Sequence, residues 1–138
     1  MLEIITKNDA GHWDIQYSDQ MTQTPSIQQF LRQLLINQLT TVEGRLNATR
    51  HSLKRKRDIP LMINRHQCLM PLPNHQCPER MYINVCAIKD IKHTQSNTKI
   101  QFHSGNIIAL RGDFRMLKKR LSKSLCDLDY LMHLNTQS

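Results

Sequence analysis

The stretch from Tyr82 to Leu110 constrains the fold more strongly than any other part of the chain. β-branched residues recur in its first part, and apolar and polar residues then alternate from Thr98 to His103. Alternation with a period of two residues is typical of a half-buried strand. Ser104-Gly105-Asn106 provides a turn whose glycine can adopt a positive φ, and the apolar pattern resumes at Ile107. The stretch therefore predicts a three-stranded antiparallel meander.

Basic residues are concentrated after residue 40. Residues 1–40 hold two basic and four acidic side chains, whereas residues 41–138 hold seventeen and seven. Within the meander, Lys89, Lys92 and Lys99 are expected on the face toward solvent. This distribution indicates a polyanionic partner, of which nucleic acid is the commonest. The alternative is a basic surface with no specific partner.

The sequence has no segment with the character of a membrane anchor. It lacks a signal-peptide core, a run of transmembrane length, a helix with a clean Lys/Arg face opposite a Trp/Phe/Leu face, and a lipidation motif. We therefore expect a cytoplasmic protein with no membrane partner and with reduced cysteines. Cys68, Cys86 and Cys126 are expected to be small core residues, with Cys86 in a strand and Cys126 at a helix end.

Two elements are predicted in the N-terminal part. Trp13–Tyr17 alternates and predicts a short edge strand. Thr24-Pro25 has the residues of a helix start, with threonine as N-cap and proline at the first helical position. Apolar residues then recur with the helical period and predict a packing helix; they are Ile27, Phe30, Leu31, Leu34, Leu35 and Leu39.

The densest basic cluster follows Gly44, which is expected to end or interrupt a helix. The cluster comprises Arg45, Arg50, Lys54, Arg55, Lys56 and Arg57. The four consecutive residues Lys54–Arg57 fit a solvated loop, and in a basic protein they fit a phosphate clamp equally well.

A hairpin is predicted next, with Asp58–Asn64 as an edge strand entered through Pro60 and Cys68–Met70 as its partner. Pro71, Pro73 and Pro78 predict irregular structure up to about residue 79.

A basic helix is predicted after the meander, capped by Gly112-Asp113. Its apolar stripe consists of Phe114, Leu117, Leu121, Leu125 and Leu128. Its cationic surface consists of Arg115, Lys118, Lys119, Arg120 and Lys123. Residues 127–138 either extend this helix or form a short docking tail. The predicted fold class is α+β, an antiparallel sheet with an N-terminal packing helix and a basic C-terminal helix.

A repeated His-x-Cys pattern invites the hypothesis of a zinc site formed by His66, Cys68, His75 and Cys77. The spacing differs from that of a zinc knuckle, and Cys68 fits an inward-facing strand position better. We therefore expect no metal and no cofactor. An enzyme is not expected either, because the glycines are scattered and the carboxylates dispersed.

Short segments in a particular order relate the chain to a known family. They are Glu43-Gly44-Arg45 with Ala48-Thr49, Pro60–Asn64, Met70-Pro71, Tyr82-Ile83, Ile88–Ile91, and Thr98–Phe102 with Gly105 and Leu110. In these segments the chain resembles the ComK family, the competence transcription factors of Gram-positive bacteria. The resemblance covers residues 41–121 best, with 1–40 matching loosely and 122–138 forming a short tail. Tyr82 and Met70 replace a tryptophan and a phenylalanine of the family, and we expect most of the family's C-terminal extension to be absent.

The resemblance implies a single domain over residues 1–138 that binds double-stranded DNA at paired A/T-rich boxes, self-associates and activates competence genes. A/T-rich tracts have a narrow, negative minor groove that attracts Arg and Lys. The candidate DNA-contacting residues are Arg45, Arg50, Lys54, Arg55, Lys56, Arg57, Lys89, Lys92, Lys99, Arg115, Lys118 and Lys119.

Two alternatives remain open. A LytTR-type DNA-binding domain fits the strands, Gly105 and the following helix, but leaves Gly44-Arg45 without a place. A basic protein-interaction or RNA-binding adaptor fits the charge, although the scarcity of aromatic residues argues against stacking on single strands.

Overall fold

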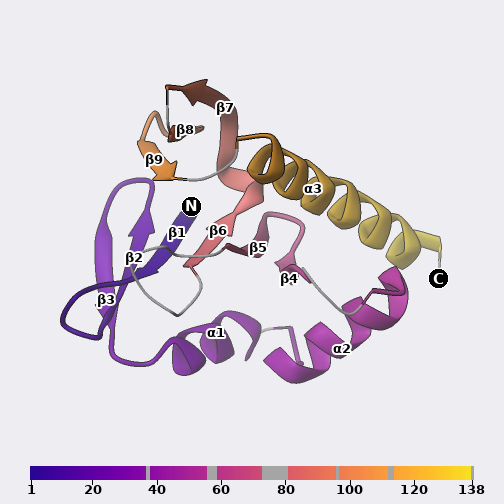
Figure 1. Cartoon of the computed structure of the whole chain (residues 1–138). Coiled ribbons are helices and arrows are strands. Elements are labelled where there is room, and N and C mark those ends of the chain that lie inside the picture. The colour runs from indigo at the N-terminus through magenta and orange to yellow at the C-terminus, as the bar shows by residue number, and fades with distance from the viewer. Residues whose placement is uncertain (37, 56–58, 73–80, 96, 112–113, 138) are drawn as a thin grey trace.

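The computed structural model describes residues 1–36, 38–55, 59–72, 81–95, 97–111 and 114–137 (Figure 1). Its α+β architecture combines helices with two antiparallel sheets, as the sequence predicted. The elements in chain order are β1 (Leu2–Lys7), β2 (Trp13–Tyr17), β3 (Met21–Thr24), α1 (Ile27–Ile36), α2 (Val42–Leu53), β4 (Leu61–Asn64), β5 (Gln67–Leu72), β6 (Met81–Asn84), the 3-10 turn η1 (Val85–Ala87), β7 (Ile88–Thr94), β8 (Asn97–Phe102), β9 (Ile107–Arg111) and α3 (Phe114–Gln137). None of the described helices is long and apolar enough to cross a bilayer.

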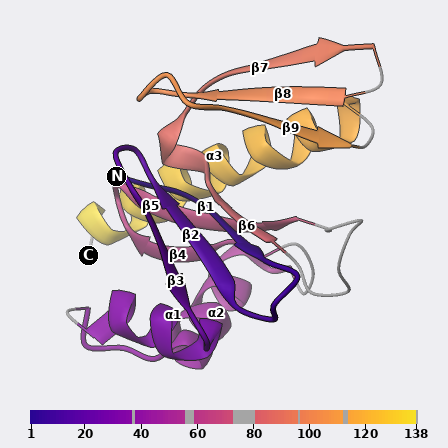
Figure 2. The same cartoon turned by 90° about the vertical axis from the view of Figure 1, so that its left-hand side faces the viewer.

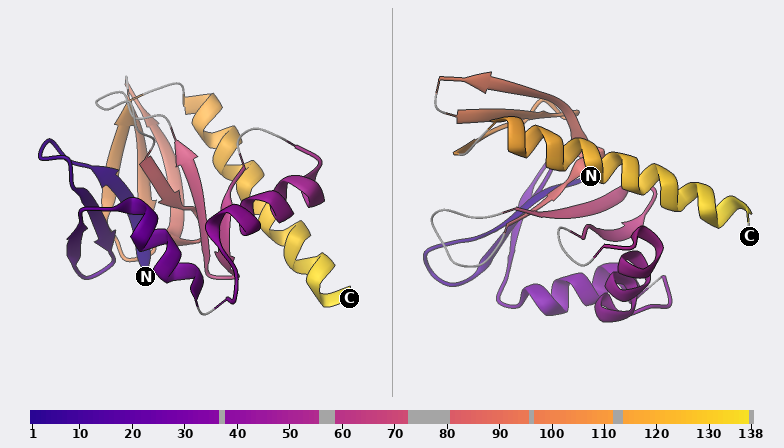
Figure 3. Two further views of the ribbon diagram at one scale, coloured as in Figure 1. Left: turned by 90° about the horizontal axis from the view of Figure 1, so that it is seen from below. Right: turned by 45° about the vertical axis from the view of Figure 1, so that its right-hand side comes forward.

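The larger sheet has six strands in the order β3-β2-β1-β6-β5-β4. Its halves meet where Ile4 of β1 pairs with Ile83 of β6, so the N-terminal strands and the later strands belong to one sheet. Helices α1 and α2 cover one face, and α3 lies across the other, between this sheet and the smaller one (Figures 2 and 3). Two buried clusters result, one on each face.

The apolar runs of the strands follow from this double coverage. In β5, Cys68 and Met70 face the cluster under α3, while Leu69 between them faces the cluster under α1 and α2. The same division separates Ile4 from Ile5 in β1. Odd and even positions of a strand point to opposite faces of the sheet. Where both faces are buried, each set of positions packs into its own core, so consecutive residues are apolar.

The smaller sheet has the order β7-β8-β9 and confirms the predicted meander from Ile88 onward. The first predicted strand is in fact divided, since Met81–Asn84 belongs to the large sheet. The division occurs at Asn84, whose side chain accepts a hydrogen bond from the Cys86 N–H and caps the 3-10 turn. Cys86 therefore lies in that turn and is half-buried, not in a strand.

Three expectations about the N-terminal part need correction. The β2 strand has the predicted bounds but lies inside the sheet, because β1 and β3 flank it. Helix α1 begins at Ile27, and the Ser26 hydroxyl accepts the Gln29 N–H as its N-cap, while Thr24 ends β3. Leu39 lies beyond the helix, with a φ of 55° and a side chain that is 95% exposed.

The expectation for Gly44 was wrong, because this residue lies in the first turn of α2. The helix starts after Thr41, whose hydroxyl accepts the Gly44 N–H at 3.0 Å. Thr41 therefore supplies the cap that outweighs the low helix propensity of one glycine. As a consequence, Arg45 and Arg50 lie on a helix rather than beside a break.

The predicted hairpin is confirmed as β4 and β5, with β4 at the sheet edge. Pro71 was expected to end regular structure, yet it lies in β5 opposite Tyr82. The described pairing with β4 reaches only Leu69, so one side of β5 is an edge at Pro71, where proline is tolerated. Pro73 and Pro78 fall outside the described residues.

Helix α3 resolves the alternatives for the C-terminal part in favour of a continuous helix to Gln137. Leu117, Leu121 and Leu128 are buried as predicted, but Leu125 is 43% exposed. Ser124 takes the inward position instead, because its hydroxyl donates to the Arg120 carbonyl at 3.0 Å. Cys126 lies within this helix and is exposed, contrary to the core position expected for it. The capping role of Gly112-Asp113 and the side chain of Phe114 fall outside the described structure.

Candidate nucleic-acid interface

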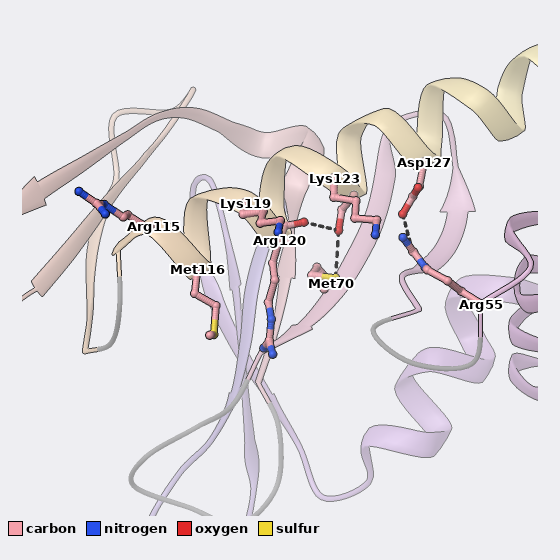
Figure 4. A pocket seen from close by; sticks show the side chains of 9 residues that line it. Arg55, Met70, Arg115, Met116, Lys119, Arg120, Lys123 and Asp127 are labelled. Atoms are coloured by element: carbon pink, nitrogen blue, oxygen red, sulfur yellow. Dashed lines mark hydrogen bonds and ion pairs between the residues drawn. The ribbon is translucent and has the colours of Figure 1, made fainter.

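A basic groove of about 430 Å³ runs along the first half of α3 (Figure 4). Its cationic lining residues are Arg55, Arg115, Lys119, Arg120 and Lys123. Asp127 closes one end of the groove, and the apolar part of the wall comes from Met70 and Met116. The groove thus combines five cationic side chains with an apolar wall.

Arg55 reaches this groove from the end of α2. Lys54 has a left-handed backbone, with a φ of 54°, and the Arg55 N–H donates to the Arg50 carbonyl at 3.2 Å. This i to i−5 bond is the Schellman ending of a helix, which turns the chain sharply away from the helix axis. The Arg55 side chain then forms an ion pair with Asp127 of α3 (Figure 4).

The helical period aligns the other cations. Arg115, Lys119 and Lys123 are four residues apart, and residues at this interval lie on one side of a helix. Met116 and Arg120 form the neighbouring row, in which Met116 is exposed and Arg120 is half-buried. From residue 115 to residue 123 this cationic side covers about 12 Å of helix axis, which is enough to face more than one phosphate of a DNA strand.

The outer face of the smaller sheet carries a second group of cations. Lys92 of β7 lies directly opposite Lys99 of β8, and both are exposed. Strand alternation places Arg111 of β9, the register partner of Asn97, on the same face. Lys89 is also exposed and lies where the register between β7 and β8 shifts.

The structure therefore brings together only part of the predicted set. Arg55, Arg115 and Lys119 line the groove, whereas Lys89, Lys92 and Lys99 lie on the small sheet. Lys118 is exposed on α3 but does not line the groove. Arg45, Arg50 and Lys54 belong to α2 or its C-terminal cap, with the Arg50 guanidinium donating to Asn47 at 2.8 Å. Lys56 and Arg57 fall outside the described residues.

Three basic residues of these surfaces were absent from the predicted set. Arg120 and Lys123 were recognised on the helix surface but not as site residues, although the i to i+4 spacing of Arg115, Lys119 and Lys123 indicates a common side. Arg111 could have been found from the alternation of the meander, which places it on the same face as Lys99.

The zinc hypothesis receives no support from the two ligands that the structure describes. Cys68 is fully buried, with its sulfur 3.5 Å from the sulfur of Met62, and burial raises the pKa of its thiol. His66 is exposed in the turn between β4 and β5. His75 and Cys77 lie outside the described residues. Among described side chains, no group of three metal ligands occurs.

Comparison with known proteins identifies the family. Neither a curated protein nor a solved structure matches the chain. The model of the family described as ComK protein, however, matches residues 15–136. The match includes the end of β2, all of β3 and almost all of α3, and so extends beyond the segments on which the resemblance was based. It also decides against a LytTR-type domain. The chain belongs to the ComK family of competence transcription factors.

Proposed function

We propose that this protein is a DNA-binding transcriptional activator of competence genes that binds A/T-rich promoter boxes. The observation that carries the proposal is the groove along α3, where five cations converge from two distant parts of the chain. Such a concentration of Arg and Lys fits the phosphate backbone of nucleic acid. We place this activity in the cytoplasm, in a single domain spanning residues 1–138.

The two cationic surfaces have different roles in this proposal. The groove residues track one strand of phosphates and set the position of the protein on the duplex. The exposed face of β7-β8-β9, with Lys92, Lys99 and Arg111, contacts a neighbouring phosphate stretch. A preference for A/T-rich boxes then comes from the narrow minor groove of such DNA, which attracts inserted Arg and Lys side chains.

The test is fluorescence anisotropy of an A/T-box duplex and a G/C-rich duplex of equal length, each across a salt series. We expect tighter binding of the A/T duplex at physiological salt. The double variant Lys119→Ala/Lys123→Ala should weaken binding and reduce the slope of log K against log salt by about 1.8, which corresponds to two lost phosphate contacts.

The matched control is Arg32→Ala/Arg65→Ala, which removes the same charge from exposed positions on α1 and the β4–β5 turn. This control should retain most of the affinity for the A/T duplex and most of the slope of log K against log salt. If both double variants lost the same DNA affinity, net charge alone would explain binding, and the groove would not be the DNA-binding site. Absence of duplex binding at low salt, or preference for RNA in competition, would favour the adaptor function instead.

A further inference from the structure

We propose that Arg55 is a defined phosphate-binding site that Asp127 occupies in the free protein. In the complex, a phosphate of the DNA backbone replaces the Asp127 carboxylate on the Arg55 guanidinium. This inference rests on the proposed function for the source of the phosphate. It assigns a role to Asp127, an acidic residue within an otherwise cationic groove.

The first support is the way in which the pair is held. The Schellman turn fixes the backbone of Arg55, and Asp127 lies on a continuous helix, so both partners start from rigid positions. Their side chains are 22% and 13% exposed, respectively. The pair is therefore shielded from bulk water while it remains on the wall of the groove. An ion pair in such a position is stronger than one on an open surface.

The second support is the charge pattern of the groove. Among its described lining residues, Asp127 is the single carboxylate beside five cations. A carboxylate and a phosphate bind a guanidinium in the same way, through charge-assisted hydrogen bonds to its planar N–H groups. Asp127 thus holds the place that a phosphate needs, and a phosphate that enters the groove must compete with it.

The consequence is that removal of the Asp127 charge strengthens DNA binding. We expect Asp127→Asn to lower the Kd for the A/T duplex at least about threefold, because the phosphate no longer has to displace a carboxylate from Arg55. The salt slope should change little, because the same number of phosphates is contacted in both proteins. Asp129→Asn is the matched control, since Asp129 is exposed two residues further along α3 and does not line the groove. It changes the net charge equally and should have a clearly smaller effect.

A double-mutant cycle tests whether the effect passes through Arg55. The gain from Asp127→Asn should disappear in an Arg55→Met background. Arg55→Met alone should weaken binding more than Arg32→Met on α1, and this comparison does not require Asp127→Asn to fold. Equal effects of the two Asp→Asn changes, or weaker binding by Asp127→Asn, would overturn the proposal. A gain that persists without Arg55 would overturn it as well.

Inorganic phosphate separates this inference from the proposed function. Phosphate should raise the melting temperature of Asp127→Asn more than that of Asp129→Asn, whether or not the protein binds DNA. If this difference is found but no duplex binds, the anion site stands and the DNA-binding function fails. If the wild type prefers the A/T duplex but the two variants respond alike to phosphate and DNA, the function stands and the Arg55 site fails.

Discussion

Asn106 donates a hydrogen bond from its side-chain amide to Glu3 at 2.8 Å and so ties the turn between β8 and β9 to the first strand of the large sheet. The Ser104 hydroxyl and the Gln16 amide donate to the same carboxylate, at 2.5 Å and 2.9 Å. Glu3 is only 1% exposed. Burial alone raises its pKa, but the three hydrogen bonds and the N-terminal ammonium hold the pKa of Glu3 below its ordinary value.

Replacing this carboxylate should loosen the joint between the two sheets. In Glu3→Gln, an amide group faces donors that previously met a charged acceptor, so we expect the free energy of unfolding at pH 7 to fall by about 1–3 kcal/mol. Urea denaturation measures the loss. Glu43→Gln, an exposed change in α2, serves as the control. If Glu3→Gln were as stable as this control, the hydrogen bonds of Glu3 would not stabilise the contact between the two sheets.

The same contact gives the protein a predictable response to acid. Because the folded-state pKa of Glu3 lies below its unfolded value, its contribution to stability is full above the unfolded pKa, which is near 4.5. It is lost as the pH falls through the folded pKa. Below pH 4.5 the stability difference between wild type and Glu3→Gln should therefore shrink. Denaturation curves at pH 7, 5 and 3.5 test this, and a constant difference would argue against a charged Glu3.

Asn84 should be one of the least replaceable residues. Its amide donates to the Leu2 carbonyl at 2.8 Å, and its oxygen accepts the N–H groups of Cys68 and Cys86 at 3.1 and 3.2 Å. Asn84→Ala leaves these buried groups without that partner, so we expect a loss of about 3 kcal/mol or more in thermal or urea unfolding. Asn47→Ala, at an exposed position of α2, should be nearly neutral. If the two variants were similarly stable, the hydrogen bonds of Asn84 would not be important for stability.

Two leucines four residues apart on α3 should respond very differently to truncation. Leu121 is 1% exposed and Leu125 is 43% exposed. Leu121→Ala should reduce the free energy of unfolding by about 2–5 kcal/mol because it leaves a cavity in the core. Leu125→Ala should cost less than about 0.5 kcal/mol. Calorimetry on the pair tests the orientation of α3, and equal losses would mean that the helix is rotated.

The sequence predicted the elements that are determined by a local pattern of residues. It did not predict those that depend on contacts with distant parts of the chain. The meander from Ile88 to Leu110 followed from its alternation and its glycine turn, and the β4–β5 hairpin from its turn residues. The division of the first predicted strand did not, because it depends on Asn84 bonding to Leu2, a residue 82 positions away. Leu125 was misplaced because Ser124 satisfies its hydroxyl within the helix and so can face the core.

The site followed the same rule. The sequence placed the cations on α3 and predicted Arg115 and Lys119 as site residues, but it missed Arg120 and Lys123. Nothing local indicated that Arg55 would meet Asp127, 72 residues later. That meeting depends on the turn at Lys54 and on the packing of α2 and α3 against opposite faces of the large sheet.

The cysteines should differ sharply in reactivity. Cys126 is exposed on α3, whereas Cys68 is fully buried and burial raises the pKa of its thiol. Because the thiolate is the reactive form, a thiol reagent at pH 7.5 should modify Cys126 rapidly and Cys68 only on unfolding. Mass spectrometry of labelled peptides gives the order, with Cys126→Ser as the control. Early labelling at Cys68 would contradict its position in the core.

Lys99 should favour binding at the expense of stability. It lies directly opposite Lys92 in the small sheet, with both side chains exposed, and like charges at opposed positions destabilise a strand pair. Lys99→Glu should therefore stabilise the fold by about 0.5 kcal/mol at low salt, while it weakens binding of the A/T duplex. Lys7→Glu at the N-terminal strand is the charge-matched control and should alter binding less. Unchanged affinity with Lys99→Glu would remove the small sheet from the interface.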